Sequence, residues 1–257
     1  MITYRYMKIK LILLLLMLSA FIVKAQYPFE KYPAIKDKEY KDWKIYDRLG
    51  EENKIHFTLT IPKFFDNGDS ITVQLTSFGD LWHQADTSQI RIYRNHQLIQ
   101  KIKENMQFDL INMYYPLRTA DFNGDGLTDL KIVVPYMGNG IAALNMRVIY
   151  LFQNADHHFT KISFTDMVSG NRPERDLDGD GNYEIITMTL QNYGEHNYWL
   201  FNLYNFNSKD LVSVNAKHDY PIMVQYLNRE NYEITDKILR AKMKDFALPL
   251  PQDYDRK

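Results

Sequence analysis

The sequence predicts an all-β protein built from repeated antiparallel sheet units. From Asn53 onward, short runs rich in β-branched and aromatic residues alternate with clusters of Asn, Asp and Gly, a pattern typical of strands joined by turns. Many of the runs alternate polar and apolar residues, as expected for sheets with one buried face. Two Asp- and Gly-rich segments, 119–129 and 174–184, carry nearly the same sequence. These features together predict a repeat-built β domain over residues 53–230.

The N-terminal stretch predicts an export signal rather than part of the fold. Basic residues precede an apolar run over 11–23, and small residues stand three and one positions before a cut after Ala25. We therefore expect a signal peptide over 1–25, starting at Met1 or Met7, and a secreted, periplasmic or cell-envelope location. An uncleaved anchor is the alternative, but the apolar run is shorter than the roughly 20 residues that span a bilayer. No stable membrane insertion is expected after cleavage.

Charge and cysteine content limit the classes of partner. The formal net charge is −1, and it becomes more negative once the basic leader is removed. A mildly acidic surface argues against nucleic acid or an anionic membrane as a partner. The chain has no cysteine, so an exported protein of this sequence must be stabilised by its core or by bound metal instead of disulfides.

The individual strands follow from the runs between turn residues. We expect ten of them, at 54–62, 70–78, 88–95, 130–137, 144–154, 158–164, 184–192, 197–206, 211–217 and 221–228.

The two ends of the mature chain are expected to lie outside the sheets. Residues 26–52 are polar with spaced prolines and predict an extended lead-in. Helical spacing occurs only within 231–257, where Ile234, Ile238, Leu239 and Met243 would share one face of a short helix, followed by a tail.

Self-similarity extends beyond the two acidic segments. Each is followed by the same order of strand-like runs, over 121–154 and 176–207. A weaker copy at 64–75 repeats the central Asn-Gly-Asp but has Phe65 where the first copy has Asp121. A repeat of roughly 50 to 60 residues is in the range of propeller blades. We therefore expect a propeller-like arrangement of about three to four blades, closed or partial.

The spacing of the acidic residues predicts two calcium loops, loop 1 (121–129) and loop 2 (176–184). Positions one, three, five and nine carry side chains that a tightly wound backbone turns toward one centre, and the glycines between them permit positive φ. Position seven would offer its backbone carbonyl. Hard, mostly anionic oxygen ligands suit Ca²⁺ and are poor for Zn²⁺. The expected ligands, for about two calcium ions, are Asp121, Asn123, Asp125, Leu127 and Asp129 in loop 1 and Asp176, Asp178, Asp180, Asn182 and Glu184 in loop 2.

Two alternatives to such a calcium loop were weighed. An EF-hand needs a Glu at position twelve and flanking helices, whereas Ile132 and Thr187 occupy that position within strand-like runs. A metal-free turn held by its own side-chain-to-backbone hydrogen bonds is the other alternative. We favour metal because three or four converging carboxylates repel one another without a cation. Loop 2 has one more carboxylate than loop 1, so it is expected to bind calcium more tightly.

The segments DFNGDGLTDL and DLDGDGNYEI resemble the calcium loops of FG-GAP and VCBS repeats, which occur in the β-propellers of integrin alpha subunits and in many bacterial secreted proteins. The resemblance covers residues 119–210, and no FG…GAP signature precedes either loop. It implies bladed sheets with calcium bound between strands on one rim, held by positions one, three, five and nine of each loop. A small propeller, a divergent one, and a sandwich that has the same loops all stay open.

The sequence predicts binding rather than catalysis. It contains no GxSxG, Walker or GxGxxG motif, and its seven histidines show no ligand spacing. The expected function is a non-enzymatic, calcium-binding scaffold or binding module for a protein or glycan partner. One alternative is a periplasmic inhibitor of a cell-wall hydrolase. The other is a polysaccharide-active enzyme, which would need two carboxylates in an aromatic-lined cleft.

Overall fold

The computed structural model describes residues 27–48, 54–78, 88–106, 108, 110, 115–135, 144–167, 172–226 and 238–257. The predicted signal peptide over 1–25 lies outside these residues. The chain forms two units, Met1–Pro33 and Ala34–Lys257. In the first, the 3-10 helix η1 (Pro28–Lys31) starts with a proline, whose fixed φ suits a first helical position.

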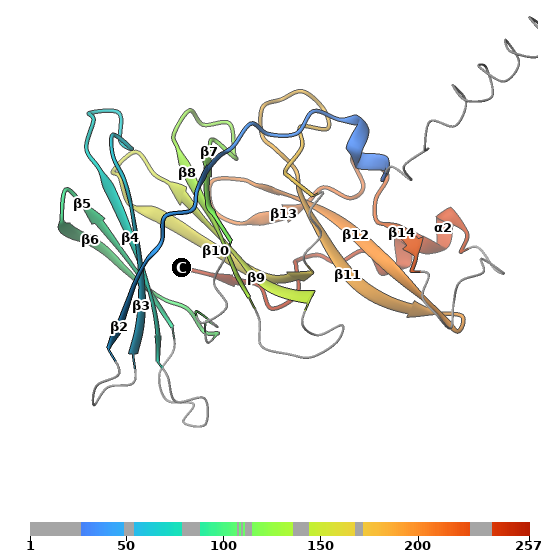
Figure 1. Ribbon diagram of the computed structural model, residues 1–257. Helices are drawn as coiled ribbons and strands as arrows, with labels where there is room; N and C mark the ends of the chain where they lie inside the picture. Colours follow the sequence, from blue (N-terminus) through green and yellow to red (C-terminus); the bar gives the residue numbers. More distant parts are fainter. Residues whose placement is uncertain are drawn as a thin grey trace, which may run out of the picture. The chain divides into compact units, whose positions relative to one another are not determined.

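The second unit consists of antiparallel sheets, which confirms the predicted all-β class (Figure 1). Over the described residues there are three sheets, and none of them closes into a barrel. No described helix is long and apolar enough to traverse a lipid bilayer.

The first sheet has the order β2-β3-β4-β5-β6. Its hairpin between β5 and β6 turns on Asn95 and His96, both with positive φ, as a two-residue type I′ connection requires. The strands are β2 (Lys44–Arg48), β3 (Lys54–Ile61), β4 (Ile71–Phe78), β5 (Gln89–Arg94) and β6 (Gln97–Lys103).

The second sheet has the order β1-β7-β8-β9-β10-β15. Its strands are β1 (Lys38–Tyr40), β7 (Leu117–Ala120), β8 (Asp129–Pro135), β9 (Asn145–Gln153), β10 (Phe159–Met167) and β15 (Asp255–Arg256). Segments near both ends of the chain thus form its edges. The lead-in predicted over 26–52 contains β1 and β2, which pair in two different sheets.

The third sheet contains β11 (Ile185–Tyr193), β12 (His196–Phe206), β13 (Leu211–Ser213) and β14 (Ile222–Gln225). Both β13 and β14 pair with β12. A single bridge between Arg175 and Glu184 precedes β11.

The three acid-containing segments occupy the same place in their sheets. Residues 62–70 join β3 to β4, loop 1 joins β7 to β8, and loop 2 joins the bridged residues Arg175 and Glu184. Each segment therefore connects two antiparallel neighbours. The repeat and the propeller arrangement stay predictions.

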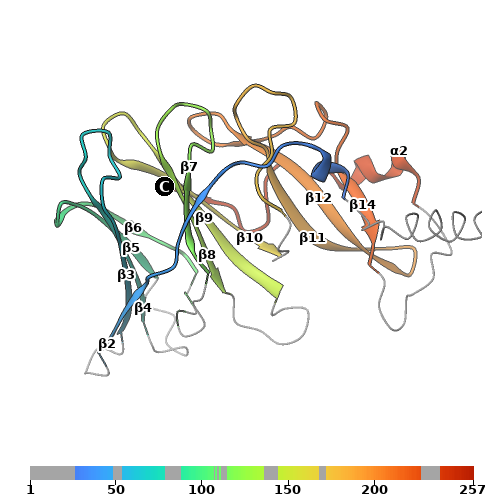
Figure 2. The same cartoon turned by 45° about the horizontal axis from the view of Figure 1, so that its top comes forward.

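The second sheet has another sheet beside each of its faces (Figure 2), and a core cluster buries each face. On β9, Ile149 and Leu151 belong to a cluster shared with β3, β4 and β5, whereas Tyr150 and Phe152 belong to a cluster shared with β11 and β12. The second sheet therefore lies between the other two. Burial on both faces explains why β9 reads as a nearly continuous apolar run instead of an alternating one. β10 is buried along almost its whole length as well, but it includes polar side chains such as Lys161 and Ser163.

The C-terminal helix is shorter than the predicted one. It comprises α2 (Arg240–Met243) and the 3-10 turn η4 (Lys244–Phe246). Ile238 is buried beside Met243 against β12 and β14, but it precedes the helix and therefore does not share a helical face with Met243 as predicted. Leu239 is 76% exposed, so its assignment to the buried face was wrong, and Ile234 lies outside the described residues.

Candidate metal centre

The first aspartate of each loop winds the backbone around its carboxylate. Asp121 Oδ1 accepts a hydrogen bond from the Gly124 amide (2.7 Å) and Oδ2 accepts one from Gly126 (2.8 Å). Asp176 accepts equivalent bonds from the two glycines of loop 2, at 2.6 and 3.2 Å. All four glycines have φ between 75° and 85°, the left-handed region that glycine enters without a steric cost.

The third and fifth positions repeat the same geometry. In loop 1, Asn123 Oδ1 accepts from the Asp125 amide (3.3 Å), and Asp125 Oδ1 accepts from the Leu127 amide (2.8 Å). The corresponding distances in loop 2 are 3.4 and 2.9 Å. Identical spacing in the sequence thus produces identical local winding.

The ninth position of loop 1 is a fully buried carboxylate. Asp129 Oδ2 accepts from the Phe122 amide (2.9 Å) and Oδ1 from the Gln153 amide (2.8 Å). Burial, reinforced by the charges of Asp125 and Asp121, raises the pKa of Asp129 to about 8 despite these hydrogen bonds. An ionised Asp129 would therefore gain from a cation in loop 1.

The ninth position of loop 2 has a different neighbour. Glu184 Oε2 accepts from the Leu177 amide (2.7 Å), which is the counterpart of the bond at Asp129. Its Oε1 lies 3.3 Å from Nε2 of His218. Burial raises the pKa of Glu184, although His218 acts in the opposite direction.

Loop 2 gathers its acidic side chains more closely than loop 1. Ligand atoms of Asp176, Asp178 and Asp180 lie within 4.8 Å of one another, and so do those of Asp178, Glu184 and His218. Over the part of the chain that the structure describes, loop 1 yields no such set of three His, Asp or Glu ligands. The carbonyl role predicted for Leu127 and Asn182 is not tested.

Two residues that the sequence did not single out, Lys217 and His218, reach loop 2 from the turn after β13. Lys217 Nζ contacts Asp178 Oδ2 and lies 3.9 Å from Asp180 Oδ2. Its hydrogen bond and charge lower the pKa of Asp178. Lys217 and His218 are far from loop 2 in sequence, so no spacing within the loop could have indicated them.

The two loops also touch each other. The Tyr183 amide donates to the Phe122 carbonyl (3.1 Å), and a Cβ added to Gly124 would lie 2.7 Å from the carbonyl oxygen of Gly181. Position 124 therefore requires glycine for two reasons, its positive φ and the close approach of loop 2.

In the weaker copy at 64–75, called the third copy from here on, the carboxylate of Asp69 is paired with the side chain of Arg94. Asp69 takes a hydrogen bond from Asn67 (2.6 Å) and one from Arg94 Nε (2.6 Å), and Asn95 donates to it as well. These bonds lower the pKa of Asp69. Phe65, at the position of the first aspartate, is buried in the core, so this copy offers no gathered carboxylates.

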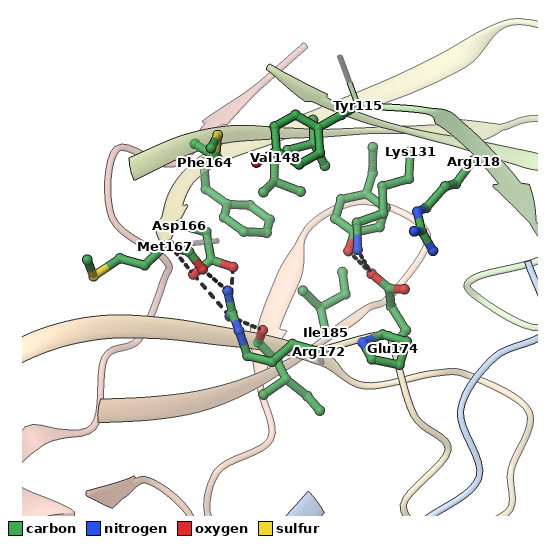
Figure 3. Close-up of a pocket in the computed structure, with 15 residues that line it drawn as sticks. Tyr115, Arg118, Lys131, Val148, Phe164, Asp166, Met167, Arg172, Glu174 and Ile185 are labelled. Atoms are coloured by element: carbon green, nitrogen blue, oxygen red, sulfur yellow. Dashed lines mark hydrogen bonds and ion pairs between the residues drawn. The ribbon is translucent and has the colours of Figure 1, made fainter. Parts of the chain in front are cut away.

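A cavity of about 240 Å³ lies beside loop 2, between β8–β10 and β11 (Figure 3). Its walls carry apolar side chains, including Val148 and Phe164 on the second sheet and Ile185 on the third. Polar groups occupy both ends of the hollow. Loop 2 begins two residues after the lining residue Glu174 and ends immediately before the lining residue Ile185, so residues that flank loop 2 form part of the cavity wall.

One end of the cavity contains a buried Glu174. Its Oε1 accepts from Lys131 Nζ and from the Tyr150 hydroxyl, and its Oε2 makes no hydrogen bond. Although burial opposes ionisation, Lys131 and Tyr150 hold the pKa of Glu174 below its usual value. Arg118 lies at the same end (Figure 3).

The other end is an ion pair that ties two sheets together. Arg172 Nη1 lies 2.9 and 3.1 Å from the two oxygens of Asp166. Asp166 Oδ1 also accepts from the amides of Met167 and Met188, each at 2.8 Å. Burial raises the pKa of Asp166 against the effect of these partners.

The chain matches no protein-family model, no curated protein and no solved structure. The resemblance to FG-GAP and VCBS repeats therefore depends on the loop residues alone.

Proposed function

We propose that this protein is a calcium-stabilised, non-enzymatic binding module that acts outside the cytoplasm. The observation that carries the proposal is the convergence of Asp176, Asp178 and Asp180 within 4.8 Å in loop 2, on a backbone winding that loop 1 repeats. Three carboxylates so close together repel one another, and the single ammonium of Lys217 offsets only part of their charge. Oxygen ligands of this kind suit Ca²⁺. The residues present therefore fit calcium.

Further features of loop 2 support the fit. The buried Oδ1 of Asn182 makes no hydrogen bond, and Glu184 supplies a carboxylate at the closing position. In loop 1, the expected ligands Asp121, Asn123, Asp125 and Asp129 would hold a second ion. When bound, calcium would neutralise the carboxylates and fix both loops where they meet.

Calcium bound in loop 2 would influence the binding of a partner in the cavity beside the loop. Glu174 and Ile185, which flank loop 2 on its two sides, line the cavity. Fixing loop 2 would therefore fix that wall. The charged and hydrogen-bonding groups at both ends suit a partner rich in hydroxyl or amide groups, either a glycan or a loop of another protein.

The calcium proposal is tested by thermal unfolding of the mature chain with and without calcium. We expect Tm to rise with calcium, because a ligand that binds only the folded state stabilises it. Asp176→Asn should remove most of the shift, whereas Asp156→Asn, in the exposed β9–β10 turn, should retain it. An unchanged Tm at about 5 mM calcium, well above the affinity range of extracellular modules, would refute the proposal.

The polysaccharide-active enzyme is a second candidate because Asp166 and Glu174 line one cavity together with Phe164. Their pKa values shift in opposite directions, as in acid–base pairs. However, Asp166 is held by Arg172 and by two backbone amides, which favours a structural role. Release of reducing ends from cell-wall glycans by the wild type, lost in Glu174→Gln, would support the enzyme over the binding module.

A further inference from the structure

His218 presents an unsatisfied imidazole nitrogen to loop 2. Its side chain is 9% exposed, and Nε2 lies 3.3 Å from Glu184 Oε1 and 3.8 Å from Asp178 Oδ2. Nε2 nevertheless makes no hydrogen bond. A buried nitrogen directed between two carboxylates without a hydrogen bond indicates that a further partner belongs at this point.

The imidazole is held in place by a turn anchored to β12. Asn215 is buried, donates to Asn202 Oδ1 (2.8 Å) and accepts from the Leu203 amide (2.8 Å). The amide of His218 donates to the Val214 carbonyl (3.3 Å). The position of His218 is therefore set by the sheet and does not depend on the conformation of loop 2.

The three ligand atoms match the requirements of a transition metal. Bonds of roughly 2.0–2.2 Å from one metal to imidazole nitrogen and carboxylate oxygen place neighbouring ligand atoms about 3–3.5 Å apart. The nitrogen–oxygen distance to Glu184 is within this range, and the distance to Asp178 is slightly above it. Imidazole is a preferred ligand of Zn²⁺, Fe²⁺, Ni²⁺ and Cu²⁺, whereas Ca²⁺ takes oxygen ligands.

We propose that loop 2 contains a transition-metal site formed by the carboxylates of Asp178 and Glu184 and Nε2 of His218. This site goes beyond the proposed calcium function, since it does not require calcium in either loop. It shares Asp178 with the set Asp176–Asp178–Asp180, so a transition metal and calcium compete at loop 2. Lys217, which contacts Asp178, leaves that carboxylate when a metal binds. Three protein ligands leave a position open for water or for a partner's group.

Co²⁺ titration of the calcium-free mature protein tests the site, because bound Co²⁺ absorbs visible light and is displaced by Zn²⁺. We expect visible bands that saturate at one Co²⁺ per chain and disappear on addition of Zn²⁺. His218→Gln should weaken Co²⁺ binding by at least about a hundredfold, more than the loss of an outer partner of a metal site. The control His96→Gln, in the exposed β5–β6 turn, should bind as the wild type does.

A second readout keeps the test valid if His218→Gln does not fold. In the wild-type protein, Zn²⁺ should shift the Nε2 resonance of one histidine in ¹⁵N NMR. No Co²⁺ bands in the wild type, equal Co²⁺ affinity in a folded His218→Gln, or no shifted histidine resonance would overturn the proposal.

The outcome is separable from that of the calcium proposal. Calcium titration of the same variants should give a Tm shift in His218→Gln at least as large as in the wild type, because the gathered aspartates are intact. A protein that binds Co²⁺ through His218 but ignores calcium would refute the calcium proposal alone. A protein that responds to calcium but binds no Co²⁺ would refute the transition-metal site alone.

Discussion

Loop 1 and loop 2 have the same internal winding but different surroundings. Their first, third, fifth and ninth residues accept hydrogen bonds from amides at the same offsets. Outside the loops the likeness ends. Asp129 binds a second backbone amide, that of Gln153, whereas Glu184 faces His218 and loop 2 also contacts Lys217.

The difference shows that the direction of the carboxylates and the cation that pairs with them are determined by different parts of the chain. Spacing within the loop sets the direction of the carboxylates. The residues that the fold brings beside the loop set the cation available to them. The third copy extends the comparison, since there Arg94 is the partner of Asp69. The acid of the third copy therefore pairs with a guanidinium, and the acids of loop 2 face an ammonium and an imidazole. Within the described residues, loop 1 forms no ion pair with a basic side chain.

The contact between the loops gives the largest expected effect. Gly124→Ala should destabilise the protein by about 2–5 kcal/mol, because a left-handed alanine costs roughly 1–2 kcal/mol and overpacking adds about 1–3 kcal/mol. Gly126→Ala is the matched control, since its φ is similar and no atom lies within 4 Å of the added Cβ. It should cost about 1–2 kcal/mol. Urea unfolding of both variants measures the difference, and equal losses would show that the loops are not in contact.

Removing the ammonium of Lys217 should increase the difference in calcium affinity between loop 2 and loop 1. We expect Lys217→Met to tighten calcium binding at loop 2 by about three- to fivefold, the range of an exposed ion pair, because Asp178 is freed from its competing cation. Loop 1 should be unaffected. Isothermal titration calorimetry resolves the two sites. Lys209→Met serves as the control for the loss of one positive charge. A weaker loop 2 in Lys217→Met would mean that Lys217 orders the ligands instead of competing with metal.

The smallest expected effect is on stability in acid, through the pair of Asp69 and Arg94 in the third copy. The folded pKa of Asp69 is lowered from 3.8, so the stability it contributes is present above about pH 4 and is lost as the pH falls through its folded pKa. Arg94→Gln should reduce this acid sensitivity of Tm, and Arg91→Gln, on the same strand, should not. Calcium should leave the Arg94 effect unchanged. An acid response that calcium abolishes would instead place metal at the third copy.

Most of the fold could be predicted from the sequence because strands and turns are local patterns. Each of the ten expected runs overlaps an observed strand. The strands that were not predicted include β1 and β15, which are short and charged and carry no alternation. Burial of the second sheet on both faces was not predictable either, since it depends on how separate sheets pack.

The candidate site could be predicted only as far as its local part. The winding around Asp121 and Asp176 follows from loop spacing. Its side-chain-to-backbone hydrogen bonds recur in both loops, and they are the bonds that the metal-free alternative predicts. His218 and Lys217 reach loop 2 through the anchoring of Asn215 to β12, a long-range contact that no motif encodes. The cavity depends in the same way on two sheets and on the loop 2 flanks.

The short edge strands of the second sheet protect it from aggregation. An unpaired strand edge offers free amides and carbonyls to another chain. Here β1 and β15 pair with β7 and β10, and they carry Lys38, Glu39, Asp255 and Arg256. Proteolytic trimming of either strand would therefore expose a template for intermolecular β-pairing long before the core itself is disturbed.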